Sequence, residues 1–171
     1  MEIYVSKKQY DHVDTILRQW QEILPETDTS PMAVFTRILR INKLIQHEIT
    51  QVFQKHGLHD GDFDLMATLY RNDKPEGLTP NELRNSIVLS SGAMTNRLDR
   101  LEAAGRIYRV ANPQDRRSIL IRLTDEGRKS LDDALGEYLE VLRLLEKPLD
   151  DETRLSLTKS LRILLINMEN N

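Results

Sequence analysis

The chain of 171 residues contains no cysteine. This absence excludes disulfides, zinc–thiolate sites and redox sensing through a thiol. The sequence also lacks a run of 18 apolar residues that could span a membrane, and its first residues lack the apolar core of a signal peptide. We therefore expect a cytoplasmic protein, and if it is a regulator, it senses something other than oxidants at a cysteine.

Features of an enzyme are also missing. The seven glycines are scattered, so the sequence offers neither a glycine-rich phosphate loop nor a nucleophile elbow. The four histidines do not cluster with carboxylates at metal-ligand spacings, and His56 and His59 fit a polar helix end better than half a metal site. We expect no catalytic residue, no metal and no cofactor.

Two consecutive helical patterns occupy the middle of the chain. Thr79 is a suitable N-cap for the first helix, and Glu82 stands where a capping-box carboxylate reaches back. The second helix is expected to begin at Ser90 or Ser91 and to end just before Gly105. A short helix followed by a longer one is the plan of a helix-turn-helix.

The second helix has two distinct faces. Met94, Leu98 and Leu101 lie within one narrow arc and are expected to face the core. The opposite arc carries small and polar side chains that can approach base edges and phosphates. The DNA contacts expected from this helix are Ser90, Ser91, Gly92, Thr95, Asn96 and Arg100. Taken alone, the pattern fits an ordinary amphipathic surface helix equally well.

A β-hairpin is predicted after this helix. Residues 107–110 and 118–123 are β-branched or alternating runs around a turn rich in Asn, Pro and Asp. Arg116 and Arg117 follow the turn. An exposed arginine pair is normally only solvated charge, but on a hairpin that follows two such helices it can enter the DNA minor groove. The combination predicts a winged helix-turn-helix.

The charge distribution supports this interpretation independently. Residues 90–122 contain seven arginines against three carboxylates, which gives this window a net charge of +4. The whole chain has a net charge of −3, so the remainder carries −7. A basic island in an acidic protein is typical of a local contact with a polyanion such as DNA.

Both ends of the chain show further apolar helical patterns, the first with a weak capping box at Ser6 and Gln9. A winged module does not need them to fold, so we interpret them as a dimerisation layer. The expected fold is mainly α with a small β-hairpin. Residues 57–123 would form the DNA-binding region, residues 1–56 the N-terminal dimerisation and ligand-pocket helices, and residues 124–171 the C-terminal dimerisation helices.

The wing tip carries the most specific motif. Asp115-Arg116-Arg117, followed by Leu123-Thr124 and Gly127, resembles the signature of the MarR family of bacterial transcription regulators. The resemblance extends over nearly the whole chain. It implies that residues 90–100 are the recognition helix, that Arg117 is the minor-groove arginine of the wing, and that Asp115 braces the wing.

A narrower resemblance rests on the only tryptophan, Trp20, in an additional N-terminal helix. It is to the urate-responsive branch of the family, the PecS- and HucR-like regulators. The ligand residues that this resemblance implies are Trp20, Asp64, Arg97 and Arg109. In that branch the Trp and the recognition-helix Arg hold the purine anion, the Asp responds to its charge, and the second Arg carries the change to the DNA-reading helix.

The helical wheel adds an observation on Arg97, which lies on the flank of the buried face. A guanidinium there should pair with a carboxylate or hold an anion, because a buried unpaired charge is costly. Asp64 is a possible partner, so a purely structural Asp64–Arg97 pair remains an alternative to a ligand site. We expect Arg97 and Arg109 to turn inward, toward Trp20 and Asp64.

These patterns predict a DNA-binding transcription regulator, a homodimeric repressor on palindromic double-stranded operators. Its DNA binding would be weakened by a small anion, urate or a related purine or phenolic acid. A winged-helix scaffold that binds protein partners without sensing a ligand is the alternative. Alanine at Arg116 and Arg117 would separate the two, because a scaffold does not need these arginines for DNA.

Overall fold

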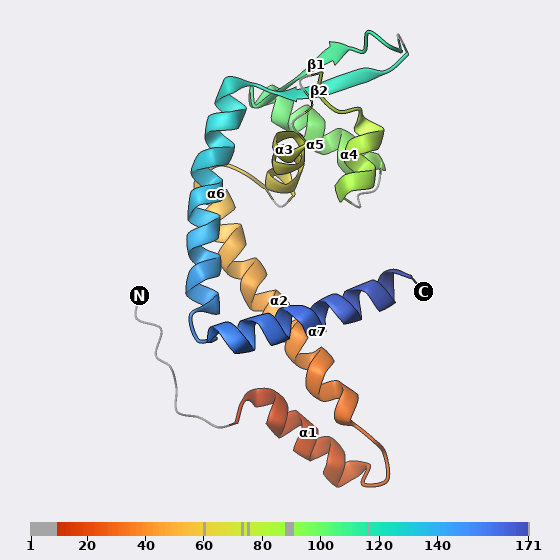
Figure 1. Ribbon diagram of the computed structural model, residues 1–171, viewed down its shortest axis with the longest axis vertical. Coiled ribbons are helices and arrows are strands. Elements are labelled where there is room, and N and C mark those ends of the chain that lie inside the picture. The colour runs from red at the N-terminus through yellow and green to blue at the C-terminus, as the bar shows by residue number, and fades with distance from the viewer. Residues whose placement is uncertain are drawn as a thin grey trace. The chain divides into compact units, whose positions relative to one another are not determined.

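The structure is a computed structural model that describes residues 10–59, 61–72, 74, 76–87, 91–115 and 117–170. Within these ranges the chain forms seven α-helices and one antiparallel β-hairpin (Figure 1). In chain order they are α1 (His12–Ile23), α2 (Ser30–Lys55), α3 (Asp62–Arg71), α4 (Pro80–Ile87), α5 (Ser91–Ala103), β1 (Ile107–Ala111), β2 (Ile119–Leu123), α6 (Asp125–Glu146) and α7 (Asp151–Glu169). The predicted fold class, mainly α with a small hairpin, is confirmed.

The chain divides into two compact units. Unit 1 consists of Met1–Glu48 and Val141–Asn171, and unit 2 of Ile49–Glu140. Helices α2 and α6 therefore each contribute residues to both units. The functional divisions at 56/57 and 123/124 remain a prediction, because compactness does not test them.

Unit 2 begins its helix-turn-helix with the predicted capping box. The Thr79 backbone N–H donates to Glu82 Oε2 at 2.8 Å, and the Glu82 N–H donates to Thr79 Oγ1 at 3.2 Å. Lys74 Nζ also donates to Glu82 Oε1 at 2.7 Å. These bonds satisfy the free donors of the first turn and fix the point at which α4 starts.

The core of unit 2 is continuous and apolar. On α5, the predicted stripe of Met94, Leu98 and Leu101 is buried, as expected. The other fully buried large apolar side chains of this unit come from α3, α4, α6, both strands and the loop before α3: Leu58, Leu65, Met66, Leu83, Ile107, Ile121 and Leu131. Burial of this many apolar side chains accounts for most of the stability of a small domain.

The hairpin packs on α3, α4 and α5 (Figure 1). Its register pairs Ile107 with Leu123 and Ala111 with Ile119, and Leu78 adds a short bridge to Ile121. This bridge requires glycine at position 77, where φ is +96° and a Cβ would lie 2.4 Å from the Ile121 carbonyl oxygen. The wing is thereby attached to the loop that precedes α4.

In unit 1 the first helix starts later in the chain than the sequence pattern predicts. Asp11 caps α1 by accepting from the backbone N–H groups of Val13 and Asp14, and Asp14 completes the capping box. The predicted box at Ser6 and Gln9 lies outside the described residues. The two acidic side chains were therefore the signal for the helix start.

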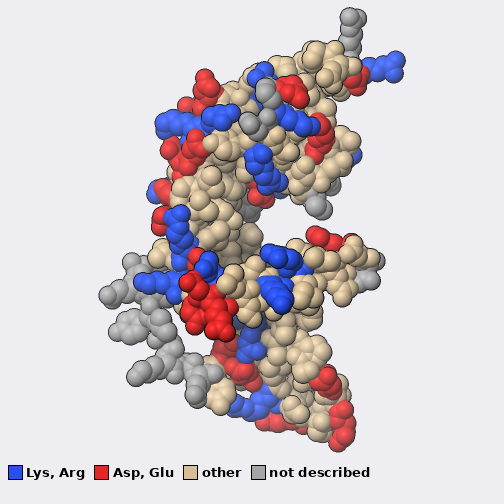
Figure 2. Space-filling model, in the orientation of Figure 1, with Lys and Arg blue, Asp and Glu red and all other residues tan. Residues whose placement is uncertain are grey.

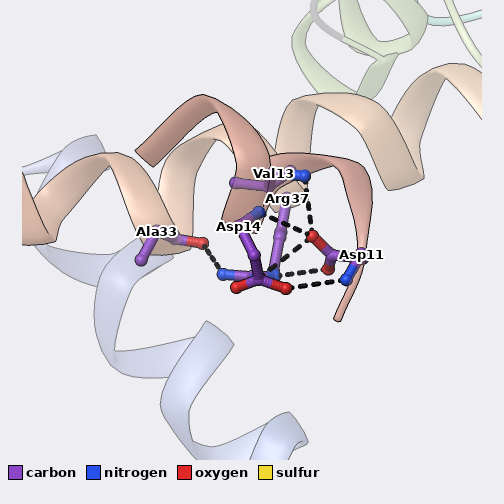
Figure 3. A network of polar contacts seen from close by, with 5 residues as sticks. All are labelled: Asp11, Val13, Asp14, Ala33 and Arg37. Atoms are coloured by element: carbon purple, nitrogen blue, oxygen red, sulfur yellow. Dashed lines mark hydrogen bonds and ion pairs between the residues drawn. The ribbon is translucent and has the colours of Figure 1, made fainter. Parts of the chain in front are cut away.

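A single arginine joins α1 to α2 within unit 1. Arg37 Nε donates to Asp11 Oδ2 at 2.8 Å, and its Nη2 donates to Asp14 Oδ1 at 2.6 Å (Figure 3). Its Nη1 also donates to the Ala33 carbonyl at 3.0 Å. The hydrogen bond to Asp11 raises the pKa of the Arg37 guanidinium. The charge-assisted bonds to the two carboxylates hold the N-terminus of α1 against α2.

Candidate nucleic-acid interface and anion cleft

The expected recognition helix α5 presents two polar side chains to solvent. Thr95 and Asn96 are both exposed on the arc opposite the buried stripe. Ser91 and Gly92 supply the first backbone positions of α5, while Ser90 lies outside the described residues. The polar arc of α5 is therefore exposed at Thr95 and Asn96, where a DNA groove could contact it.

Arg100 is engaged by a carboxylate that the sequence did not single out. Its Nη2 donates to Asp62 Oδ1 and its Nε donates to Asp62 Oδ2 at 3.2 Å. The Asp62 side chain is 2% exposed, whereas that of Arg100 is 39% exposed. This hydrogen bonding raises the pKa of Arg100 above its ordinary value. The Asp62 carboxylate thus engages the Arg100 guanidinium, and the expected contact of Arg100 with DNA stays a prediction.

Asp62 has a second structural task at the start of α3. Its Oδ2 accepts from the His59 backbone N–H at 2.9 Å. Gly61, the residue before it, has φ +78°, a left-handed conformation that favours glycine. The tight turn into α3 thus aims a carboxylate inward toward α5. An Asp after a Gly at a helix start is the sequence signal that could have indicated this carboxylate.

Arg97 lies directly over Gly61. A Cβ on Gly61 would approach Arg97 Nη1 to 1.6 Å, so the guanidinium occupies the space that any side chain would need. Among the residues that the structure describes, Arg97 forms neither an ion pair nor a hydrogen bond. The alternative of a structural Asp64–Arg97 pair is not seen between these two described residues: the Asp64 side chain is exposed, and the Asp64 carbonyl accepts from Thr68 Oγ1.

A polar cleft opens beside these two arginines within unit 2. Its volume is about 440 Å³, which is enough for a small aromatic anion. The lining residues are Thr50, Gln54, His59, Ala93, Asn96, Arg97 and Arg100. Sequence reasoning missed Thr50, Gln54 and His59 as neighbours of Arg97, since they come from α2 and the loop after it. Two guanidiniums at one cleft favour an anionic ligand.

Arg109 does not turn toward Asp64, which corrects a second expectation. Its Nη2 donates to Asp99 Oδ1 and its Nη1 to Glu102 Oε2, both at 2.6 Å. These two carboxylates lie on α5, so Arg109 joins strand β1 to that helix. It also borders a mostly apolar cleft of about 520 Å³ between α4, α5 and the hairpin.

The wing turn is shaped by Asp115. Its Oδ1 accepts from the Arg117 backbone N–H at 3.0 Å, and its carbonyl accepts from the Ser118 N–H at 3.0 Å. Arg117 is exposed at this turn, and Arg116 lies outside the described residues. In Figure 2 a basic side chain projects from the free end of the hairpin, while basic and acidic side chains are interspersed over the rest of unit 2.

Trp20 is the one member of the expected ligand set in unit 1, whereas Asp64, Arg97 and Arg109 belong to unit 2. It lies on α1 and is 40% exposed, and its carbonyl accepts from the Leu24 N–H at the end of the helix. The Arg37 contacts described above hold the opposite end of the same helix.

Metal-ligand clusters and membrane-spanning helices are both absent from the described ranges. Among these residues, no group of three His, Asp or Glu side chains is arranged to hold a metal ion. In the same part of the chain, none of the helices combines the length and hydropathy needed to cross a membrane.

Comparison with known proteins places these features in a family. The MarR family model matches residues 58–119. The chain is 35% identical over 145 residues to the HTH-type transcriptional regulator PecS of Dickeya dadantii (strain 3937), a match that covers 85% of this chain and 87% of PecS.

Solved structures share the fold. The MarR family transcriptional regulator AbsC from Streptomyces coelicolor matches with a TM-score of 0.73 and 21% identity, over 85% of this chain and 97% of AbsC. A MarR variant from E. coli in complex with operator DNA matches with a TM-score of 0.69 and 22% identity, over 85% of this chain and 97% of that one.

Proposed function

The chain belongs to the MarR family of DNA-binding transcription regulators, and on that premise we propose that it is a homodimeric repressor released from its operator by a small anion. The operator is a double-stranded palindrome, because a two-fold dimer presents two equivalent recognition helices. The anion is urate or a related purine or phenolic acid. The observation that carries the ligand proposal is that Arg97 lies beside a polar cleft and pairs with no residue that the structure describes.

The proposed DNA surface combines the N-terminal part of α5 with the wing. Thr95 and Asn96 are exposed on α5, and Arg117 is exposed at the hairpin turn. Side chains at these places can reach the major groove and the adjacent minor groove, respectively. The related fold of E. coli MarR in complex with operator DNA supports this use of the module.

The proposed dimer rests on the apolar surface of unit 1. Helix α7 has no buried residue although it is rich in leucine and isoleucine, and α2 adds further exposed apolar side chains. The exposed members on these helices are Met32, Val34, Phe35, Leu39, Ile41, Leu44, Leu155, Leu157, Leu161, Ile163, Leu165, Ile166 and Met168. A soluble monomer rarely leaves such a surface uncovered, and a second copy of the chain would bury it.

The proposed ligand site centres on Arg97 and the cleft that it borders. A guanidinium can bind a planar anion through two parallel hydrogen bonds, and Asn96 and Gln54 offer further donors at the same cleft. The assignment of Trp20, Asp64 and Arg109 to the ligand site rests on the family resemblance. In the structure Arg109 forms ion pairs with two carboxylates of α5. A displacement of Arg109 would therefore displace the DNA-reading helix as well.

The test is a titration of the protein with urate in which the fluorescence of Trp20 is measured at each concentration. Because the chain has one tryptophan, any quenching reports on its own surroundings. A gel shift on the promoter region upstream of the protein's own gene is measured in parallel, with and without urate. We expect quenching together with loss of the shifted band. Unchanged fluorescence and an unchanged shift would remove urate as the ligand.

Two substitutions make this test specific. Trp20→Phe keeps an aromatic ring while it removes the reporter and the indole, and Asp64→Asn removes the charge that the anion would meet. We expect both variants to bind the operator and to respond less to urate. Arg97→Gln is a weaker test, because Arg97 belongs to α5 and its loss could alter DNA binding directly.

A further inference from the structure

One buried ion pair joins α5 to the start of α3. Asp62 accepts from Arg100 through both carboxylate oxygens, and one of these oxygens also accepts from the His59 N–H. The Asp62 residue as a whole is 1% exposed with the Arg100 side chain in place. A buried carboxylate that loses its cation is strongly destabilised. The pair therefore constrains where Arg100, and with it α5, can lie.

Arg100 also borders the polar cleft of unit 2. Arg100 forms part of the wall of the cleft that Arg97 and Asn96 also line. Its guanidinium is thus in contact with a buried acid and borders a space open to an anion. Arg97 is spaced three residues before it on the same helix, and no described residue neutralises Arg97. An anion drawn in by Arg97 would compete with Asp62 for Arg100.

We propose that the Asp62–Arg100 pair is a latch that holds α5 in its DNA-reading position, and that an anion in the cleft opens this latch. Arg100 is then a positioning residue, and its contribution to DNA binding is made through Asp62 rather than through a phosphate. The opening step rests on the proposed function, since it requires an anion in the cleft. The holding step does not, since it concerns DNA binding without ligand.

The two steps are linked thermodynamically. A closed latch favours DNA and opposes the anion, so removal of the latch should weaken operator binding and strengthen anion binding by related factors. Couplings of this kind are usually between about 5-fold and 150-fold. For Asp62→Asn we expect operator affinity to fall by about tenfold and urate affinity to rise. Non-specific DNA affinity should not fall, because the variant has lost a negative charge.

The experiment measures binding of a labelled operator and of an unrelated duplex by fluorescence anisotropy over a range of salt concentrations. The proteins are the wild type, Asp62→Asn, Arg100→Gln and the double variant. Asp132→Asn is the matched control, because it makes the same change at an exposed carboxylate of unit 2. Thermal unfolding of each variant is the control for folding. Asparagine at position 62 can still accept from the His59 N–H, so the turn into α3 keeps this hydrogen bond.

The latch predicts that the two single variants lose operator affinity to a similar extent and that the double variant loses no more than either. It also predicts that operator binding by each single variant depends on salt concentration with the same slope as that of the wild type. If Arg100 contacts a phosphate instead, Arg100→Gln alone will reduce the salt slope by about one. That result, or operator affinity of Asp62→Asn equal to that of the wild type, would overturn the latch.

Urate added to the same titrations separates the two proposals. If urate leaves wild-type operator binding unchanged, the ligand assignment and the opening step both fail. The holding step is still judged by the ligand-free curves. If urate releases wild-type protein and releases Asp62→Asn by the same factor, the ligand assignment stands and the latch is not the route of the signal.

Discussion

The two units of the molecule bury their apolar side chains very differently. In unit 2, leucines such as Leu65 and Leu83 have no exposed surface. The rings of Phe53, Phe63 and Tyr138 lie against one another with centroids 4.6 to 5.9 Å apart. In unit 1, helix α7 has no buried residue. Unit 2 contains its own core, whereas unit 1 leaves much of its apolar surface to be covered. This difference supports the proposed division, in which DNA reading resides in the self-sufficient unit 2 and assembly in unit 1.

The largest effect should come from placing charge on α7. The double substitution Leu161→Glu and Leu165→Glu puts two carboxylates on the apolar surface that a second copy would bury, where they cannot be solvated. We expect a monomer in analytical ultracentrifugation and operator affinity reduced by more than about a hundredfold. Ser160→Glu is the control on the same helix. A double variant that remains dimeric would place the interface elsewhere.

The next effect concerns the core of unit 2. Leu65→Ala removes a fully buried side chain and should lower the free energy of unfolding by about 2–5 kcal/mol. Leu155→Ala, on the exposed face of α7, should cost much less at low protein concentration and more where dimers are populated. Urea unfolding at two protein concentrations measures both. Equal losses at both concentrations for Leu155→Ala would contradict the proposed division between the units.

Replacing the wing arginines should weaken DNA binding without affecting assembly. For Arg116→Ala with Arg117→Ala we expect operator affinity to fall by about tenfold to a hundredfold and the salt slope to fall by about two. The dimer should persist, because the wing belongs to unit 2. Retention of both the affinity and the slope would favour a scaffold that does not use the wing on DNA.

The smallest effect is a pH dependence at the start of α4. The hydrogen bond from Lys74, with those from Thr79, lowers the pKa of Glu82 to about 2. A depressed pKa means that Glu82 stabilises the fold above its unfolded pKa of about 4.3 and that this contribution is lost as the pH falls toward 2. Glu82→Gln should therefore be less stable than wild type at pH 7, by under about 1 kcal/mol because the pair is partly exposed. Thermal unfolding at pH 7 and pH 3 should show the difference shrinking; a constant difference would contradict the assignment.

Local patterns predicted most of the fold. The capping box of Thr79 and Glu82, the buried stripe of Met94 on α5 and the hairpin bounds depend on interactions within a few residues, so the sequence displays them directly. Thr124 caps α6 by an equally local contact, since its Oγ1 accepts from the Gly127 N–H at 2.8 Å. Such short-range signals need no knowledge of the tertiary arrangement.

Partners distant in sequence could not be predicted in the same way. The helical wheel placed Arg97 on the flank of α5, yet it could not show that Gly61 would lie beneath it. Asp62 is 38 positions from Arg100, and the sequence analysis named Asp64, in the same turn, but not Asp62. Which of them faces inward depends on the turn at Gly61, and only the packed structure specifies that.

In the proposed mechanism, a small anion bound near Arg97 lowers the affinity of this regulator for a palindromic operator. The most direct measurement is the dissociation constant of a labelled promoter fragment, determined at one fixed salt concentration with and without saturating urate. We predict an increase of at least about tenfold with urate, within the usual range of allosteric coupling. The same dissociation constant with and without urate would contradict the account.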